Sequence, residues 1–277
     1  MSHDSVFLLG RSCVQCGPFN DRIYLMSLFP EDGPGIVDEL FDMAASRDLS
    51  KIFAKVPRSL ASPFVADGFE MEAEVPGMYP GEDGVFMSFY RRQWRKELEN
   101  GEELDKVLAF ANAKKGKGNV STLPSFLSLR SLGPADAAAL AGLYGRIFDT
   151  YPFPVDDPEF LRMEMAGNVR FKGVFRDGTL VGAASAEIGP DGHSAEMTDF
   201  AVEPSCRNTG IAGELLRALE KDCAEFGINC FYTIARACSY GINSLFSKGG
   251  YEFSGQLINN TNIGGSLESM NVWYRLP

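Results

Sequence analysis

The segment AVEPSCRNTGIAGELLRALE, residues 201–220, combines residue types that suit the binding of an anion. It passes from an apolar strand, through a proline and a glycine, into an amphipathic helix. Gly210 and Ala212 allow close approach to the backbone, and the first N–H groups of a helix have no acceptor within it. With Arg207 beside them, these donors suit a diphosphate. The spacing R-x-x-G-x-A differs from a Walker loop and from the dinucleotide-binding fingerprint.

Two carboxylates precede this loop on the same predicted strand, where the stretch EMTDF contains Glu196 and Asp199. Because side chains alternate along a strand, we expect Glu196 and Thr198 on one face and Asp199 on the other. A carboxylate at such a place can accept a proton from a reacting group, or it can be a structural or solvated residue.

The overall composition limits the possible partners. The chain has 277 residues, 45% of them hydrophobic, with a formal net charge of −11 and a pI near 4.8. This acidity argues against a nucleic-acid partner and suits a cationic small molecule, although many proteins are acidic for solubility alone. Because no apolar run reaches the length of a membrane span and no basic leader is visible, we expect a cytoplasmic protein without a membrane partner.

The six cysteines do not predict a disulfide framework in a chain of this kind. Cys13 and Cys16 form a C-x-x-C pair, but no second ligand pair has the spacing of a zinc site. The residues that follow, CGPFNDRIYLMSL, predict a turn and a strand instead of the helix of a redox motif. We therefore predict no metal.

A polar stretch rich in Gly and Lys, at 115–125, is the predicted linker between two parts of the chain. A helix is expected before it, over about 93–113. After it, the periodicity predicts the element order β-α-α-β-β-β-α-β-α-β-β over 126–277.

The first part of the chain repeats features of the second. GIVDELFDMAASRDLSKIFAKV at 35–56 is similar to GIAGELLRALEKDCAEFGINCFYTIA at 210–235. DGFEMEAEVP is similar to GGYEFSGQLI, and VFMSFYRR to MNVWYRLP. Chance similarity between two amphipathic helices would explain the first match alone, whereas three matches in the same order predict an internal duplication.

The second part resembles the GNAT acetyltransferases. The resemblance covers about 126–277 and rests on the strand that ends in Val202-x-Pro204, the R-x-x-G-x-A loop with its helix, a buried strand, a short helix, and Gly250-Tyr251. It implies an α/β (α+β) fold class, with a mixed, mostly antiparallel sheet and helices on both faces. It also implies acetyl-CoA as the cofactor.

The resemblance further implies where acetyl-CoA binds. Its diphosphate is expected on the loop of Arg207, Asn208, Thr209, Gly210, Ile211, Ala212 and Gly213. Its pantetheine is expected between splayed strands, on the backbone of Phe200, Ala201 and Val202. Many family members have an Asn and a Tyr beside the cofactor, and the corresponding residues here are Ser239 and Phe246.

A closer resemblance, to the β-lysine N6-acetyltransferases, extends over nearly the whole chain. It rests on AEMTDFAV, YTIARACSYGIN and GYEFSGQLINNTNIGGSLESMNVWYRL in the second part, and on NDRIYLMSL and KIFAKVP in the first. That subfamily works beside a lysine 2,3-aminomutase and makes N6-acetyl-β-lysine, a compatible solute. The resemblance implies β-lysine as the small-molecule amine substrate.

These resemblances imply three regions: a degenerate GNAT-like half at 1–114, the linker at 115–125 and a catalytic GNAT domain at 126–277. In the first half, EDGP precedes Gly35 where Arg207 to Thr209 precede Gly210, and its negative charge would repel a diphosphate. We therefore expect that this half does not bind coenzyme A, and that it covers the active domain or completes the substrate pocket.

The implied transfer requires a base, because an alkyl ammonium has a pKa of roughly 10.4 and must lose a proton before it attacks a thioester. Glu196 is similar in position to the strand-four glutamate base of histone acetyltransferases, so it is the predicted base. Asp199 is the second candidate, or a ligand for the ammonium. With Phe246 at the position of the usual acid, Tyr240 is the candidate acid and Tyr251 a structural aromatic; departure of coenzyme A as a thiolate stays open.

The substrate carries two ammonium groups and one carboxylate. Arg236 suits the carboxylate, and Tyr151 and Phe153 of the loop TYPFPVDD are expected to form an aromatic wall. Further candidates come from an Asn-rich stretch that would equally suit an ordinary surface hairpin: Asn259, Asn260, Thr261, Asn262, Glu268 and Asn271.

Two other functions stay open at this point. One is a GNAT enzyme for another small amine, such as a polyamine, an aminoglycoside or α-lysine. The other is an acyl-CoA sensor without turnover, which a phenylalanine at the position of the acid would suit. The intact loop and Glu196 favour catalysis. The sequence is compatible with a monomer or a homodimer.

Overall fold

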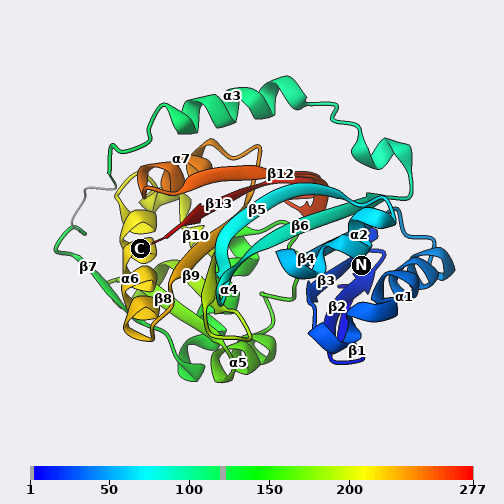
Figure 1. Ribbon diagram of the computed structural model, residues 1–277. Coiled ribbons are helices and arrows are strands. Elements are labelled where there is room, and N and C mark those ends of the chain that lie inside the picture. Colours follow the sequence, from blue (N-terminus) through cyan, green and yellow to red (C-terminus); the bar gives the residue numbers. More distant parts are fainter. Residues whose placement is uncertain (1–2, 119–122, 277) are drawn as a thin grey trace.

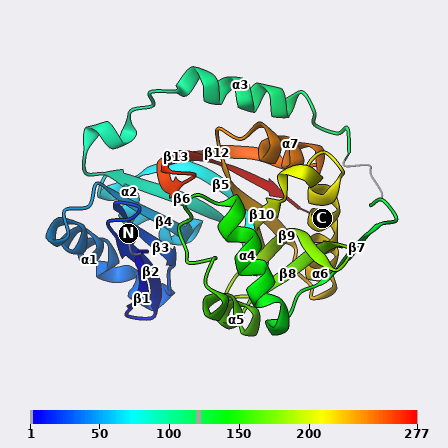
Figure 2. The ribbon, with the colours of Figure 1, turned by 180° about the vertical axis from the view of Figure 1, so that it is seen from behind.

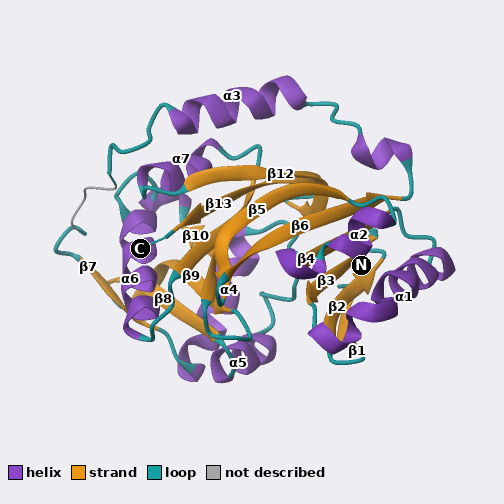
Figure 3. Ribbon diagram, viewed as in Figure 1, coloured by secondary structure: helices purple, strands orange, loops and turns teal. Residues whose placement is uncertain are grey.

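The computed structural model describes residues 3–118 and 123–276, which form two β-sheets (Figure 1, Figure 3). The elements of the second sheet and its helices, called the C-terminal half below, follow the predicted order. They are β7 (Leu127–Ser131), α4 (Ala137–Ile147), α5 (Pro158–Ala166), β8 (Val169–Arg176), β9 (Thr179–Ile188), β10 (Ser194–Val202), α6 (Ile211–Glu225), β11 (Cys230–Arg236), α7 (Tyr240–Lys248), β12 (Glu252–Ile263) and β13 (Ser266–Arg275).

The sheet of the C-terminal half has the strand order β12-β13-β11-β10-β9-β8-β7, and among its described strands only β10 and β11 are parallel. Helices cover both faces. Leu215 of α6 packs in a buried cluster with Met197 of β10, whereas Leu140 of α4 packs on the other side with Ala201 of the same strand. The predicted mixed, mostly antiparallel sheet with helices on both faces is therefore confirmed.

The N-terminal half is a shorter version of the same arrangement. Its elements are β1 (Ser5–Leu9), β2 (Ser12–Gly17), β3 (Arg22–Ser27), α1 (Gly33–Ser46), β4 (Lys51–Pro57), α2 (Ser62–Ala66), β5 (Glu70–Tyr79) and β6 (Glu82–Tyr90). The order β1-β2-β3-β4-β6-β5, with β3 and β4 parallel, repeats that of β8 to β13. Gly35 and Gly210, which correspond, have φ values of 89° and 85°. The topology confirms two GNAT-like halves.

The two halves pack against each other through their corresponding strands β5 and β12 (Figure 2). Gly255 is necessary at this contact, because a Cβ there would lie 2.0 Å from the Glu72 carbonyl oxygen. Apolar side chains of both halves form one buried cluster between the sheets: Tyr24, Phe53, Ala73, Val75, Met78, Phe86, Cys230, Tyr232, Leu257, Ile263, Met270 and Val272. Burial of this apolar surface holds the halves in a fixed relation.

The segment between the halves differs from the single helix expected over 93–113. It begins with a 3-10 turn at Gln93–Lys96, and α3 spans Gly101–Asn112. The α3 helix packs on α7 of the C-terminal half, where the Ser247 hydroxyl donates to the Ala111 carbonyl at 2.7 Å. The predicted linker at 115–125 falls partly on 119–122, outside the described residues, and the three domain boundaries stay a prediction.

No helix within the described residues is long and apolar enough to cross a membrane. The same residues contain no cluster of three or more His, Cys, Asp or Glu side chains that could hold a metal ion. Cys13 and Cys16 lie on β2, followed by the predicted turn and strand, and burial raises the pKa of both thiols. Raised pKa values disfavour the thiolate that metal binding and redox exchange require.

Candidate active site

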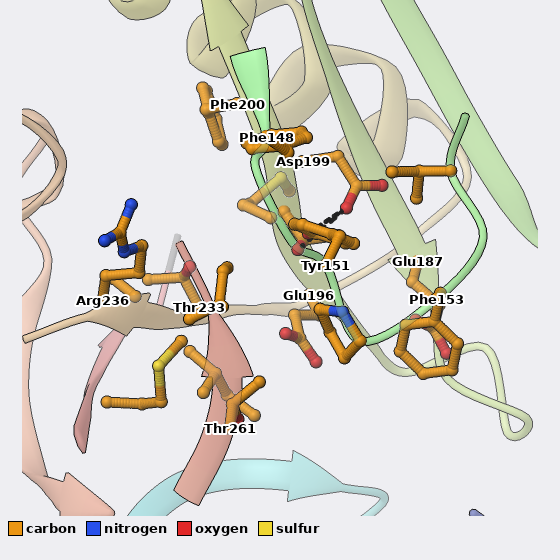
Figure 4. A pocket seen from close by; sticks show the side chains of 18 of the residues that line it. Phe148, Tyr151, Phe153, Glu187, Glu196, Asp199, Phe200, Thr233, Arg236 and Thr261 are labelled. Carbon is orange, nitrogen blue, oxygen red and sulfur yellow. Dashed lines mark hydrogen bonds between the residues drawn. The ribbon is translucent and has the colours of Figure 1, made fainter. Parts of the chain in front are cut away.

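A cavity of about 770 Å³ lies between the two halves, at the place where β10 and β11 separate (Figure 4). These strands pair only from Ser194 to Glu196, and beyond that pair they diverge. The C-terminal half contributes most of the lining, and the N-terminal half contributes Arg22, Tyr24 and Lys55 among others. The volume is in the range of small-molecule sites.

Glu196 lies in the wall of this cavity, in the last residue pair that joins β10 to β11. It is opposite Glu187 on β9 and Tyr232 on β11. Burial raises the pKa of Glu196 to about 7, and the negative charge of Glu187 adds to the rise, while Lys55 acts against it. A carboxylate with a pKa near 7 is suited to accept a proton at neutral pH.

Lys55 of β4 brings a positive charge from the N-terminal half to these carboxylates. Its Nζ donates to the Tyr232 hydroxyl at 3.0 Å. Burial alone would lower the pKa of Lys55, but the nearby Tyr232, Glu196 and Glu187 raise it above its ordinary value. Lys55 therefore stays protonated and holds down the pKa of Glu196.

Asp199 does not lie on the face opposite Glu196, so that expectation is wrong. Its φ of 56° is in the left-handed region, and the register of β10 against β9 shifts between Thr198 and Ala201. This bulge interrupts the alternation of side chains and turns Asp199 into the same cavity as Glu196 (Figure 4).

The Asp199 carboxylate is held by three hydroxyl groups. It accepts hydrogen bonds from Tyr151, from Ser185 at 2.5 Å and from Thr198 at 3.5 Å. Burial raises the pKa of Asp199, and these donors act in the opposite direction. Because it already accepts three hydrogen bonds, Asp199 fixes the Tyr151 ring in the cavity wall and is a weaker candidate than Glu196 for the base.

The predicted anion site forms the N-terminus of α6. Gly210 precedes the helix with its left-handed φ, and Asn208 also has a positive φ of 62°. The first bond of the helix runs from the Glu214 N–H to the Gly210 carbonyl at 3.1 Å, so the N–H groups of residues 211–213 have no acceptor within the helix. The exposed Arg207 lines the cavity beside them. These free donors and the guanidinium fit a diphosphate.

The end of β10 leads from this loop into the cavity. Ala201 pairs with Ala183 of β9, but β11 has already diverged, so no described strand pairs with the other edge of residues 200–202. Phe200 lines the cavity and contacts Phe246 edge to face, with ring centroids 5.5 Å apart. A free backbone edge beside apolar rings fits the amide-containing pantetheine chain.

Helix α7 brings two further predicted residues to the cavity and directs a third away from it. Ser239 caps the helix by accepting from the Ile242 N–H at 3.4 Å, and it lines the cavity with Phe246. Tyr240 is outside the lining: its hydroxyl donates to Glu103 of α3 at 2.8 Å. Tyr240, the first residue of α7, points toward α3. The structure therefore does not bring this candidate acid to the site.

Five of the nine predicted substrate-binding residues line the cavity, namely Tyr151, Phe153, Arg236, Asn260 and Thr261. Tyr151 and Phe153 form part of its wall (Figure 4). Arg236 is already engaged, because its Nε and one terminal nitrogen donate to the two carboxylate oxygens of Glu268 at 2.8 and 2.5 Å. A substrate carboxylate would have to compete with this pair.

The other four predicted residues are Glu268, which binds Arg236, and three asparagines that make structural hydrogen bonds. Asn259 donates to the carbonyls of Arg95 and Glu97 at 3.1 and 2.8 Å, Asn262 to that of Phe19 at 2.9 Å, and Asn271 to the Asn243 side chain at 2.9 Å. They lie in β12 and β13, whose strands are longer than expected, and not in a surface loop. The first two tie the C-terminal half to the N-terminal part of the chain.

The amino-acid sequence is similar to those of known proteins. The profile of the Acetyltransferase (GNAT) family matches residues 140–246, from α4 to α7. A β-lysine N(6)-acetyltransferase of Methanococcus maripaludis is 34% identical over 273 residues, which are 99% of each chain. The chain belongs to the GNAT acetyltransferase family. A second β-lysine N(6)-acetyltransferase, from Methanosarcina mazei, is 33% identical over 261 residues. The match covers 87% of this chain and 96% of the M. mazei protein. The N-acetyltransferase YodP of Bacillus subtilis is 33% identical over 74% of each chain.

Sequence reasoning misses five titratable residues of the acetyltransferase cavity: Arg22, Tyr24, Lys55, Glu164 and Glu187. A signal exists for the first three, because they lie in NDRIYLMSL and KIFAKVP, the two stretches that carry the resemblance of the first half to the β-lysine N6-acetyltransferases. The two glutamates lie on α5 and β9, in stretches without a recognisable motif.

Replacing Lys55 with methionine is expected to shift the pH dependence of the acetyltransferase. Lys55 lowers the pKa of Glu196, so removal of its charge raises that pKa above about 7. The ionised, proton-accepting form of Glu196 then requires a higher pH, and kcat/KM at pH 7 falls by roughly tenfold while recovering in alkaline buffer. A pH series of kcat/KM for K55M and wild type checks this, and an unmoved lower limb would contradict it.

Proposed function

We propose that this acetyltransferase transfers the acetyl group of acetyl-CoA to the N6 amine of β-lysine, giving N6-acetyl-β-lysine, a compatible solute. The proposal is carried by one cavity in which Glu196 and the Arg207 loop meet charged residues of the N-terminal half. The relatives that match this chain along nearly its whole length, and thus share that half, are β-lysine N(6)-acetyltransferases.

Residues of the C-terminal half would hold acetyl-CoA. Arg207 and the free N–H groups at the start of α6 would bind the diphosphate, and the unpaired edge of residues 200–202 would bind the pantetheine amides. When bound, acetyl-CoA supplies the thioester carbonyl that the amine attacks and a thiolate that can depart.

Glu196 would take the proton from the N6 ammonium group, directly or through one water molecule. At neutral pH a group with a pKa of about 7 is divided between its two forms, so it can both accept the proton and pass it on. Lys55 keeps part of the Glu196 population ionised, because its charge opposes protonation. The loss of the proton turns the ammonium into a nucleophile.

The second ammonium group of the substrate has two carboxylates available. Glu187 and Glu164 both line the cavity, and burial raises the pKa of each. A bound ammonium would compensate their charge and return these pKa values toward the ordinary range. This acidic wall favours a diamine or diamino acid over a monoamine.

The described residues offer no acid for the departing sulfur at the usual place. Phe246 occupies it and is fully buried, and Tyr240 bonds to Glu103 instead. A thiol has a pKa of roughly 8.5, so a thiolate departs without a proton donor far more readily than an alkoxide would. We therefore assign the protonation of the sulfur to solvent.

The amine substrate is tested by measuring thiol release from acetyl-CoA with β-lysine, α-lysine and spermidine. We expect kcat/KM for β-lysine to exceed that for α-lysine by at least about tenfold. The second amine of α-lysine is one carbon away from its position in β-lysine, so the buried polar groups that bind it would be left unpaired. A preference for spermidine would make the enzyme a polyamine acetyltransferase. Tight binding of acetyl-CoA without turnover of any amine would indicate a sensor.

A further inference from the structure

Arg22 of β3 is a buried cation that has only neutral partners. The residue is 3% exposed. One terminal nitrogen donates to the Asn260 carbonyl at 2.5 Å and to the Thr261 hydroxyl at 3.1 Å, and the other donates to the Gln15 side-chain oxygen at 3.3 Å. Its Nε is buried and has no hydrogen-bond partner in the part of the chain that the structure describes. Among the described residues, no carboxylate forms an ion pair with this guanidinium.

The other two buried cations near Arg22 are neutralised. Lys51 pairs with Glu72 at 3.2 Å, and Arg95 pairs with Asp21 at 3.4 Å. Asp4 is an acidic group in the electrostatic reach of Arg22, but its carboxylate is taken up by the N–H groups of the 19–20 turn and the Asn20 side chain. A buried guanidinium without a counter-ion is costly unless an anion completes the site.

Arg22 lies in the wall of the same cavity as Glu196. Asn260 and Thr261, which bind its guanidinium, are cavity residues as well. In Figure 4, Thr261 and Phe200 lie on opposite sides of Glu196. The thioester is expected at the Phe200 end. Tyr24 connects the two sites, since its ring centroid is 5.1 Å from the Arg22 Cζ and its pKa is raised by burial and by Glu196.

The ionisation state of Arg22 suits an anion site. Burial lowers the pKa of Arg22 to about 10, and the positive charge of Arg95 contributes in the same direction. The guanidinium nevertheless keeps its proton at neutral pH, and a carboxylate bound beside it would raise the pKa again. A planar guanidinium is also the side chain best shaped for a carboxylate.

We infer that Arg22 binds the carboxylate of the amino-acid substrate, at the end of the cavity opposite the thioester, so that the N-terminal half selects an amino acid over a simple diamine. This inference rests on the proposed function. The amine that reacts lies at Glu196, and the carboxylate at the far end of the same extended molecule reaches Arg22. The degenerate half thereby acquires a role in specificity without binding coenzyme A.

Three other cations line the cavity; Arg207 is assigned to the diphosphate, and Arg236 and Lys55 are weaker candidates for this role. Arg236 is bound at two points by Glu268 and lies near Ser239 on the side of α7. Lys55 is surrounded by Glu196, Glu187 and Tyr232, where a further carboxylate would meet like charges. Arg22 differs from both, because it is bonded to no carboxylate that the structure describes and no carboxylate of the cavity acts on its charge.

The test compares β-lysine with 1,4-diaminopentane, the same molecule without its carboxylate, in wild type and in Arg22→Met. For wild type, kcat/KM is expected to favour β-lysine by roughly 10–150-fold, the range of a hydrogen-bonded charge. In R22M this preference falls to within about threefold, because β-lysine loses its contact while the diamine never had one. Arg95→Met is the matched control: it removes a buried arginine that does not line the cavity, and it keeps the wild-type preference.

Each outcome decides the inference. A loss of activity that is equal for the two substrates in R22M would mean that Arg22 is structural, and a preference abolished by Arg236→Met instead would assign the carboxylate to Arg236. If R22M does not fold, as judged by acetyl-CoA binding, Arg22→Lys keeps the charge with a shorter reach and is expected to lose part of the preference. Failure of wild type to acetylate β-lysine would reject the proposed function itself, a result distinct from an unchanged preference in R22M.

Discussion

Glu196→Gln is expected to lower kcat/KM for acetyl transfer by about 10²–10⁴-fold, the contribution of a positioned general base. Glutamine keeps the size of the side chain and can still bond to Tyr232, but it cannot take a proton from an ammonium group. The affinity for acetyl-CoA should change little, because Glu196 lies away from the N–H groups at the start of α6. Thiol-release kinetics and calorimetric titration with acetyl-CoA separate the two effects.

The pH dependence provides an independent signature of the same residue. Ionised Glu196 is the active form, so kcat/KM of wild type rises as the pH passes through about 7, and E196Q lacks this limb. Glu220→Gln is a matched control, since Glu220 is also a buried carboxylate with a pKa raised by burial, but it pairs with Arg275 outside the cavity. A limb near pH 7 that persists in E196Q would assign the base to another group.

Local signals are sufficient to predict the architecture of the C-terminal half and the glycine turn at the start of α6. Periodicity distinguishes strands from helices within short windows, and Gly210 is necessary because the residue before α6 has a left-handed φ. The duplication was also visible, because Gly35 repeats this requirement at the start of α1. Such features depend on neighbours in the sequence, so the sequence alone predicts them.

Contacts between distant parts of the chain could not be predicted in the same way. Asp199 enters the cavity because a bulge and the Tyr151 hydroxyl turn it there, and strand alternation contains no sign of either. The Tyr240 hydroxyl donates to Glu103 of α3, and the position of α3 on α7 follows from tertiary packing. The charge of Arg236 is taken by Glu268, which is 32 residues away.

The role of the N-terminal half is the clearest example of a feature that depends on contacts between distant parts of the chain. The absence of an arginine before Gly35 is visible in the sequence, and the structure shows that the Asp32 carboxylate of EDGP accepts from the Ser12 N–H at 2.8 Å. The contribution of Lys55 to the electrostatics of Glu196 was not readable, because it requires the packing of β5 on β12. If the resemblance covered only the GNAT domain at 126–277, nothing in the sequence would indicate that Lys55 and its neighbours in the N-terminal half belong to the site.

Reversal of charge at Arg207 is expected to weaken the binding of acetyl-CoA by at least about 10–150-fold. Loss of a charge-assisted hydrogen bond to a phosphate accounts for roughly 1.5–3 kcal/mol, and the new glutamate would add repulsion. Arg207 is exposed and donates only weakly to the Val202 carbonyl, at 3.4 Å, so Arg207→Glu should leave the fold intact. Calorimetric titration at low and high salt measures the effect, which salt should reduce.

Arg146→Glu separates a local effect from a general change of charge. Arg146 is exposed, bonds to Glu203 at 2.9 Å and does not line the cavity, and its reversal changes the net charge by the same amount as R207E. R146E is expected to alter the affinity by less than about threefold, because a solvated charge at a distance is screened.

S-acetylpantetheine, which lacks the diphosphate, makes the assignment of Arg207 specific. If Arg207 and the N–H groups of α6 bind the diphosphate, R207E and wild type should use this shorter donor with the same kcat/KM, although both use it poorly. A similar loss with both donors would mean that the substitution disturbs the catalytic centre and not the diphosphate site. An unchanged affinity for acetyl-CoA in R207E would remove the loop from the cofactor site, and the orientation of the whole cavity, with the thioester at Phe200 and the carboxylate at Arg22, would have to be reversed.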